Sequence, residues 1–363
     1  MLSSLSIRNF RSILDMTVNF SFAEKKAPAG FRDSDIVFFA EPKKHVRLVP
    51  ALALYGSNAS GKSNVLMALG TFRDCAVSGV QGKFHPDKLH PEWRTTAFEA
   101  TIVRDGKRFV YAIEYDRDEF RKESLAVDGT VLFSIDGDRR SFGSLATSSY
   151  PAARLEEIFR VECSTPLKKQ TSSFLSVIGK RYPGLCPRVT AVYDFFSDGI
   201  VVLSENSIHL SRGVDMLAAV LEKADDPDPV RHAFERITDL LENLDIHINR
   251  MELSRRRIRL DRDAQKRNYL DVDPEFLTRL TSFQKEGDNI ILNTDRIRSF
   301  HQDADGREVE FDFMTEESSG TQIVAGLLGV FLAVLESGGV VAVDELDRSL
   351  HPLLLIELVR LFK

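Results

Sequence analysis

Cysteine is scarce in this sequence, which contains only Cys75, Cys163 and Cys186 among its 363 residues. Their number is odd, and no two of them have the C-x-x-C spacing of a zinc or redox site. The sequence therefore supports neither a disulfide framework nor a zinc site. It predicts three ordinary thiols in a protein of the reducing cytoplasm.

A long uninterrupted apolar segment is also lacking. Residues 1–11 do not contain the apolar core of a signal peptide. The longest apolar stretch, 323–335, is interrupted by glycine and is shorter than the roughly 20 residues that span a bilayer. Heptads are not sustained over several turns, which argues against a long coiled coil. We expect a soluble, cytoplasmic protein without a membrane partner.

The excess of one charge is small, with 54 acidic against 48 basic residues and a net charge of -6. This balance argues against a protein whose whole surface binds nucleic acid, although it permits a local basic groove. Hydrophobic residues make up 43% of the chain and charged residues 28%, as in ordinary globular proteins. The length exceeds that of one compact core, so we expect two domains or one domain with a large insertion.

The most specific motif is a complete G-x-x-x-x-G-K-S pattern. It consists of Gly56, Ser57, Asn58, Ala59, Ser60, Gly61, Lys62 and Ser63. The apolar run 49–55 before it predicts a buried strand, and the apolar spacing over 62–73 predicts a helix. This context indicates a phosphate loop for ATP, in which Lys62 neutralises the β- and γ-phosphates and the Ser63 hydroxyl binds Mg²⁺.

Two carboxylates follow an apolar run near the end of the chain. Residues 339–343 predict a buried strand, and Asp344 and Glu345 come directly after it. Ligands of α/β sheets bind at the carboxyl ends of strands. We expect Asp344 to hold Mg²⁺ and Glu345 to be the catalytic group that orients or deprotonates the attacking water. A strand that simply ends in solvated acids is the alternative, which the complete phosphate loop disfavours.

A serine–glycine turn precedes the apolar helix predicted at 324–335. We define this turn by four residues, Ser318, Ser319, Gly320 and Thr321. An ordinary helix N-cap has the same composition, but a helix N-terminus also offers N–H groups to an anion.

Together these motifs resemble the ABC-type ATPases of the structural-maintenance-of-chromosomes, RecF and overcoming-lysogenization-defect group, and above all its stand-alone bacterial AAA-type members. The resemblance is carried by residues 9–12 (Asn-Phe-Arg-Ser), 55–63, 317–322 and 343–352, and it leaves the middle of the chain unmatched. It implies an α/β fold. This would be a P-loop NTPase head of ABC type with a mixed β-sheet, an antiparallel β subdomain and an inserted mainly helical region.

On this interpretation the head is discontinuous. Residues 1–150 form its N-terminal half, 151–285 the mainly helical insertion with a basic strand, and 286–363 the C-terminal half. Asp-Gly pairs at 105–106 and 128–129 predict the hairpins of the β subdomain. The switch histidine of the family normally follows the strand after Glu345, so we expect the natural protein to continue beyond the given sequence.

The resemblance also implies a head that dimerises around ATP. The serine–glycine turn would act in trans and cap the γ-phosphate held by the partner's phosphate loop. Asp347 matches the D-loop, which crosses the dimer interface. Arg11 and His351 lie in matching segments without a definite role, and for His351 a helix-start role and a catalytic role both stay open. Gln81 is a candidate Q-loop glutamine, although a surface loop is favoured.

A basic stretch occupies residues 254–269. Phosphate contacts of nucleic acids come from Arg and Lys, so the segment from Arg255 to Arg259 is a candidate nucleic-acid surface. The alternation of Arg255, Arg257 and Arg259 equally fits a half-exposed strand whose outer face is solvated or binds a protein.

The function favoured here is a Mg²⁺-dependent ATPase that forms a homodimer or higher oligomer through its heads. It would regulate a nuclease or toxin effector in bacterial anti-phage, that is antiviral, defence. The alternative is a RecF-like repair or recombination ATPase that closes on DNA. A scaffold that binds ATP with little hydrolysis is a third hypothesis. The inserted region and the Asn-Phe-Arg-Ser segment argue against a membrane-transporter subunit.

Overall fold

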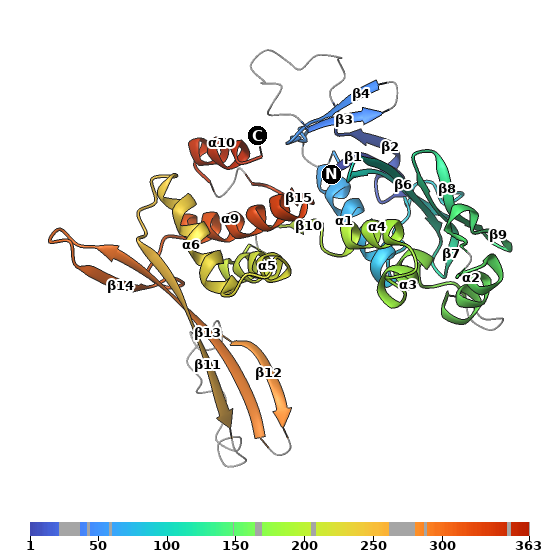
Figure 1. Cartoon of the computed structure of the whole chain (residues 1–363). Helices are drawn as coiled ribbons and strands as arrows, with labels where there is room; N and C mark the ends of the chain where they lie inside the picture. Colours follow the sequence, from blue (N-terminus) through green and yellow to red (C-terminus); the bar gives the residue numbers. More distant parts are fainter. Residues whose placement is uncertain are drawn as a thin grey trace. The chain divides into compact units, whose positions relative to one another are not determined.

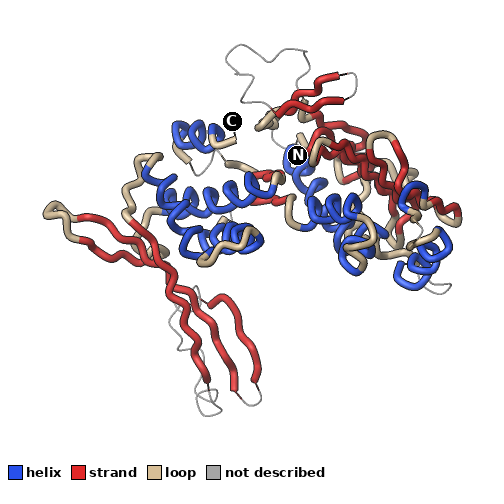
Figure 2. Tube along the Cα trace, in the orientation of Figure 1, coloured by secondary structure: helices blue, strands red, loops and turns tan. Residues whose placement is uncertain are grey.

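The computed structural model describes residues 1–21, 37–41, 44–57, 60–147, 149–163, 169–204, 208–260, 280–286, 289–346 and 350–362. Its contacts divide the chain into two compact units. Unit 1 comprises Met1–Glu205, Val334–Leu346 and Leu358–Lys363, and unit 2 comprises Asn206–Ala333 and Asp347–Glu357. Figures 1 and 2 show their helices and strands. These units differ from the predicted division at 150 and 285, because residues 151–205 contact the antiparallel sheet of unit 1.

Unit 1 contains a seven-stranded antiparallel sheet in the order β2-β1-β5-β6-β7-β8-β9. Its strands are β1 (Leu2–Phe10), β2 (Ile13–Asn19), β5 (Thr96–Arg104), β6 (Lys107–Tyr115), β7 (Phe120–Val127), β8 (Thr130–Asp136) and β9 (Arg139–Ser141). Both predicted hairpins are confirmed. Their turn residues Asp105, Gly106, Asp128 and Gly129 all have positive φ, as a tight hairpin turn requires.

Helices share one apolar core with this sheet. They are α1 (Lys62–Ser78), α2 (Ala152–Ile158) with a π-helical turn (Phe159–Cys163), α3 (Phe174–Arg181) and α4 (Pro187–Ser197), besides a 3-10 turn (Gly143–Leu145). Phe72 of α1 fixes that helix on the sheet, since its ring centroid lies 5.3 Å from that of Phe98 and 5.8 Å from that of Tyr111. The three cysteines are free thiols, as predicted, and all three are buried. Burial raises the pKa of the Cys75 thiol to about 12.

Two short strands form a separate parallel pair in unit 1, β10 (Ile200–Leu203) and β15 (Val340–Val343). A side chain at Gly339 would place its Cβ 2.3 Å from the carbonyl oxygen of Gly199, so the approach of the two strands requires glycine. Strand β15 is half-buried rather than buried as predicted, because in the described part of the chain it pairs only with β10.

The buried strand predicted at 49–55 is not formed. A hairpin of β3 (Val37–Glu41) and β4 (Lys44–Leu48) comes before it, and the Val49 N–H donates to the Phe20 carbonyl at 2.7 Å. Residues 51–57 are then exposed and irregular, and 92% of Tyr55 is accessible. An apolar run becomes a strand only where a neighbour supplies hydrogen bonds, and none of the described strands pairs with this segment.

Unit 2 combines helices with a second antiparallel sheet. Its elements are α5 (Leu210–Lys223), α6 (Pro229–Glu242), β11 (Arg250–Leu260), β12 (Leu280–Glu286), β13 (Asn289–Gln302), β14 (Glu308–Asp312), α9 (Ser319–Ser337) and α10 (Pro352–Arg360), and the last residues of α9 and α10 belong to unit 1. Strand β13 pairs with β11, β12 and β14. Strands β13 and β14 form a hairpin with its turn at 303–306, and α6 begins at Pro229 with Asp228 as its N-cap residue.

Helix α9 has 19 residues and is apolar enough to cross a bilayer by length and composition alone. The expectation that this segment is too short to span a bilayer was therefore wrong. The remaining criterion is how much of the helix is buried inside the protein. More than half of its apolar window is buried. Its glycines meet α5 backbone to backbone, since a Cβ at Gly329 would lie 2.6 Å from the carbonyl carbon of Gly213. This contact packs α9 against α5 inside unit 2.

Glu123 of β7 is fully buried beneath the start of α3. Its carboxylate accepts hydrogen bonds from the N–H groups of Phe174 at 2.7 Å and Leu175 at 2.9 Å, and from the Tyr111 hydroxyl at 3.0 Å. Burial raises the pKa of Glu123 to about 7, although these donors act in the opposite direction.

This raised pKa predicts a pH-dependent stability. Unfolded, Glu123 ionises near pH 4.5, whereas folded it stays protonated until about pH 7. Its contribution is therefore fully present below pH 4.5 and falls by about 3 kcal/mol as the pH rises to 7. Urea unfolding should show wild type losing stability relative to Glu123→Gln across this window. A difference that does not change with pH would contradict the prediction.

Candidate nucleotide-binding site

Glycine suits two positions of the phosphate loop, one because a neighbouring side chain lies close and one because of its backbone conformation. A Cβ at Gly56 would lie 2.6 Å from the Ser60 Oγ. Gly61, which caps α1, has a φ of 95°, in the left-handed region. Asn58 and Ala59 lie outside the described residues. The chain therefore turns sharply directly before α1, as the sequence pattern predicted.

Lys62 and Ser63 begin α1. The Lys62 ammonium donates to the carbonyl oxygens of Gly56 at 2.8 Å and Ser57 at 2.9 Å, so a positive charge is held across the loop. The N–H groups of a first helical turn have no acceptor within the helix, and the helix dipole adds positive potential there. The loop thus offers a cation, N–H donors and the Ser63 hydroxyl, which is the chemistry that binds a polyphosphate.

The Asn-Phe-Arg-Ser segment lies against this loop. The Ser12 Oγ accepts a hydrogen bond from the Asn64 side-chain amide at 2.8 Å, and it would lie 3.1 Å from a Cβ at Gly61. Arg11 is exposed and has a left-handed φ of 52°. Sequence reasoning noted the segment but not its contact with Asn64. Arg11 is therefore one residue away from a side chain that touches the loop.

The acidic pair follows β15. The Asp344 N–H donates to the Leu203 carbonyl at 3.0 Å, which continues the β10–β15 pairing. Glu345 is exposed and has a φ of 55°. A left-handed conformation costs a residue with a side chain about 1 kcal/mol or more, and such strain concentrates at functional sites. The hairpin-turn residues Asp105 and Asp128 have a similar φ, so this conformation is compatible with a site role for Glu345 without establishing it.

Helix α1 and the acidic pair are related through β10. A Cβ at Gly70 would lie 3.5 Å from Val202, and the Arg73 guanidinium donates to the Ile200 carbonyl at 3.3 Å. Later residues of α1 thus meet earlier residues of β10, so the two elements run antiparallel. Because β15 is parallel to β10, the N-terminus of α1 and the carboxyl end of β15 face the same side of unit 1.

The oxygen donors near this edge fit a small hard cation. The Ser63 hydroxyl and the Asp344 carboxylate are ligand types that Mg²⁺ prefers. Among the residues that the structure describes, no three or more His, Cys, Asp or Glu side chains gather as a metal site. This donor set suits an ion that takes its remaining ligands from phosphates and water.

The serine–glycine turn lies in unit 2 at the start of α9. The Ser318 Oγ accepts from the Thr321 N–H at 3.1 Å and lies 2.9 Å from the Thr321 hydroxyl, so Ser318 is the helix N-cap. Ser318 and Ser319 are exposed, and Gly320 is half-buried. The turn thus caps the helix, and the N–H groups at this helix N-terminus can also donate to an anion.

The remaining predicted residues have different outcomes. The His351 Nδ1 accepts from the Leu353 N–H at 3.3 Å, which is a helix-start role. Gln81 is exposed in the turn that follows the C-terminus of α1. Because α1 has 17 residues, this turn lies about 25 Å from the phosphate loop, so Gln81 is not the Q-loop glutamine. Asp347 lies outside the described residues, as do the side chains of Arg255 to Arg259, although their strand β11 is formed.

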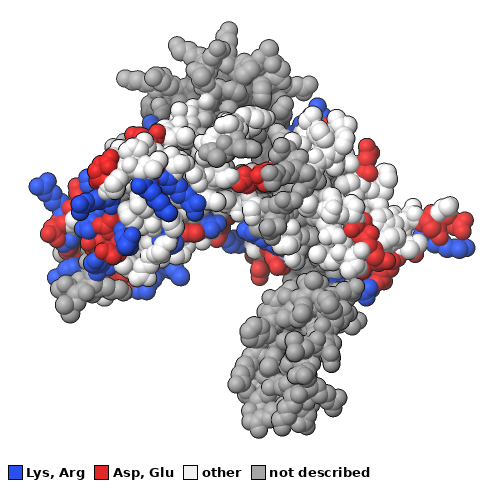
Figure 3. Space-filling view, turned by 180° about the vertical axis from the view of Figure 1, so that it is seen from behind, with Lys and Arg blue, Asp and Glu red and all other residues white. Residues whose placement is uncertain are grey.

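The described charges of both units are largely matched. On the face shown in Figure 3, basic and acidic side chains alternate over unit 1 without separating into areas of one sign. In unit 2, Arg250 of β11 and Arg296 and Arg298 of β13 face acids of β14. The pairs are Arg250–Glu308 at 3.0 Å, Arg296–Asp312 at 3.0 Å and Arg298–Glu310 at 3.3 Å. These arginines are therefore not a bare basic surface for nucleic acid.

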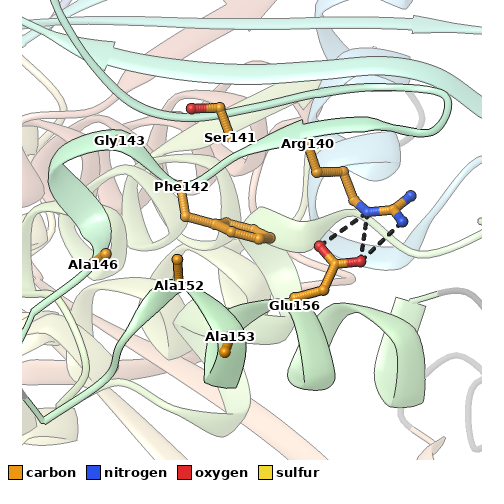
Figure 4. Close-up of a pocket in the computed structure, with 8 residues that line it drawn as sticks. All are labelled: Arg140, Ser141, Phe142, Gly143, Ala146, Ala152, Ala153 and Glu156. Carbon is orange, nitrogen blue, oxygen red and sulfur yellow. Dashed lines mark hydrogen bonds and ion pairs between the residues drawn. The ribbon is translucent and has the colours of Figure 1, made fainter.

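A pocket of about 460 Å³ lies between β9 and α2 in unit 1. Figure 4 shows Arg140 and Glu156 pairing at its rim beside Phe142. The Arg140 Nε lies 2.9 Å from the Glu156 carboxylate, and its guanidinium lies 5.0 Å from the Phe159 ring centroid. Since this arginine is already neutralised, the pocket is a poorer phosphate site than the loop at 56–63.

A protein-family model matches this chain. The family described as "AAA domain, putative AbiEii toxin, Type IV TA system" matches residues 52–141 and 221–363, more than half of the chain. These stretches include the phosphate loop, the serine–glycine turn and the acidic pair, but not the Asn-Phe-Arg-Ser segment. A comparison with curated proteins finds no match.

Proposed function

Because the chain belongs to the AAA-domain family described as a putative AbiEii toxin of type IV toxin–antitoxin systems, we propose that it is a Mg²⁺-dependent ATPase that works as a dimer of heads. The observation that carries the proposal is the antiparallel contact of α1 with β10. It directs the phosphate loop and the acidic pair toward the same side of unit 1.

Each residue has a defined task in this proposal. Lys62 balances the charge of the β- and γ-phosphates, and exposed Arg11 adds a second positive charge beside the loop. Ser63 and Asp344 hold Mg²⁺, which neutralises phosphate charge when it is bound. Glu345 accepts the proton of the attacking water, since a carboxylate that is open to solvent can reach water directly.

The second head completes the site. The serine–glycine turn is exposed at the N-terminus of α9 and binds the γ-phosphate held by the partner's loop, while Asp347 lies at the interface. A single chain therefore binds ATP through Lys62 but hydrolyses it poorly. The proposed assembly is a homodimer or a higher oligomer built from such pairs.

ATP turnover per chain should consequently rise with protein concentration, and the apparent ATP affinity should rise with it, because a partner that contacts the γ-phosphate favours the ATP-bound chain. We would measure both over about a hundredfold range of concentration and follow the oligomeric state by analytical ultracentrifugation, because a site shared between chains obeys mass action. Full turnover in a sample that stays monomeric would contradict the dimer.

The biological role proposed is control of an effector, a nuclease or toxin, in cytoplasmic anti-phage defence, and the family description supports it. Its test is effector activity in the presence and absence of the ATP-bound protein. ATP-dependent DNA binding that weakens with salt and is lost when Arg255, Arg257 and Arg259 are replaced by Ala would favour the RecF-like alternative instead.

A further inference from the structure

Strand β13 contacts the residue directly before the serine–glycine turn. The Ser299 hydroxyl and the His301 Nε2 both lie 2.6 Å from the same carboxylate oxygen of Glu317. Ser299 and His301 are two positions apart in the strand, so their side chains project from one face. We call these three residues the clasp.

The clasp is sheltered and its carboxylate is well held. Only 10% of the Glu317 side chain is accessible, and Ser299 is fully buried. The His301 ring also contacts Phe311 of β14, with 4.7 Å between the ring centroids. The imidazole is therefore held both by Glu317 and by this aromatic ring. A carboxylate this little exposed is retained at a cost unless its oxygens are bonded. The contact is thus specific rather than an incidental surface pair.

Gln322 holds the same turn from its helix side. Its side-chain amide donates to the carbonyl oxygens of Met314 at 3.1 Å and Glu317 at 3.0 Å. The helix itself is anchored, because Gly329 contacts the backbone of Gly213 in α5 too closely for any side chain. The residues just before the turn are therefore connected to a sheet on one side and to a fixed helix on the other.

We propose that Ser299, His301 and Glu317 are positioning residues that hold the serine–glycine turn in the orientation needed to meet the partner's γ-phosphate. The proposal rests on the proposed function, in which that turn acts in trans. The clasp residues touch no nucleotide, and they act by fixing the backbone at Glu317, next to Ser318. Strand β13, which is central in its sheet (Figure 1), supplies the rigid support.

The first experiment separates positioning from folding. Glu317→Ala and His301→Ala should lower kcat about 10- to 100-fold, the effect expected when a site group is displaced by about 1 Å. ATP affinity of the monomer should not change, because the phosphate loop is intact. His301→Gln, whose amide nitrogen can replace Nε2 as donor, should recover most of the activity. Glu310→Ala is the matched control, an exposed carboxylate of β14 outside the clasp.

The second experiment uses mixed dimers. A Lys62→Ala chain keeps its turn and clasp, and a Glu317→Ala chain keeps its phosphate loop. Mixing them creates one site with both intact parts, so turnover should exceed that of either variant alone. Ser318→Arg mixed with Lys62→Ala tests the shared site itself.

These mixtures distinguish the two proposals. If Ser318→Arg is complemented by Lys62→Ala but Glu317→Ala is not, the shared site stands and the clasp proposal is overturned. If neither pair recovers activity, the proposed dimeric function fails and the clasp proposal fails with it. Unchanged kcat in Glu317→Ala would also overturn the clasp.

Discussion

Glu345→Gln should lower ATP turnover by about 10²- to 10⁴-fold, the usual contribution of a general base. The amide keeps the size of the side chain and removes the group that accepts the proton. The left-handed backbone at residue 345 is unchanged, because Gln has the same backbone constraints as Glu. ATP binding should remain, so the variant should accumulate as an ATP-bound dimer. Single-turnover measurement of phosphate release and size-exclusion chromatography with ATP would test both expectations.

Glu242→Gln is the matched control for this variant, because Glu242 is an exposed carboxylate of α6 in unit 2. It should hydrolyse ATP at the wild-type rate. If wild type and Glu345→Gln turn over equally, Glu345 is not the base, and the scaffold that binds ATP with little hydrolysis becomes the better description.

Lys62→Ala should greatly weaken ATP binding. Removing a cation that meets two phosphates costs about 3 kcal/mol, which is more than a hundredfold in Kd. The change should hardly affect folding, since the bonds that the ammonium makes to described residues are to two carbonyl groups at an exposed site. Titration with a fluorescent ATP analogue would give the affinity, and thermal unfolding would confirm the intact fold. Wild-type affinity in this variant would place the nucleotide elsewhere.

Lys83→Ala provides a matched control for this second variant. Its ammonium likewise donates to two backbone carbonyl groups, those of Asp74 and Gly79, but at the opposite end of α1. The two lysines therefore make equivalent local bonds at opposite poles of one helix dipole. Lys83→Ala should reduce stability at the end of the helix and leave ATP affinity unchanged.

The two variants also predict an order of events. Lys62→Ala should lose ATP binding and ATP-dependent dimerisation together, because the γ-phosphate is what the partner's turn is proposed to bind. Glu345→Gln should keep both and lose only hydrolysis. Dimerisation of Lys62→Ala upon addition of ATP would show that the heads associate without nucleotide in the phosphate loop.

Local features of the site were predictable from the sequence. The pattern at 56–63 specifies a turn before a helix because Gly61 has a left-handed backbone that residues with a side chain rarely adopt. The Asp-Gly hairpins and the acidic end of β15 are likewise determined by neighbouring residues. The strand expected at 49–55 was wrong for the opposite reason, since a strand depends on a hydrogen-bonding partner that an apolar run does not identify.

The sequence by itself thus identified the groups that we propose to bind phosphate and Mg²⁺ and to activate water, namely Lys62, Ser63, Asp344 and Glu345. Tertiary structure alone decided how they are arranged. The antiparallel course of α1 against β10, the contact of Ser12 with Asn64, and the clasp at Glu317 join residues that are distant in the chain. Such contacts depend on the folding of whole units around their cores, and no local pattern of residues specifies them.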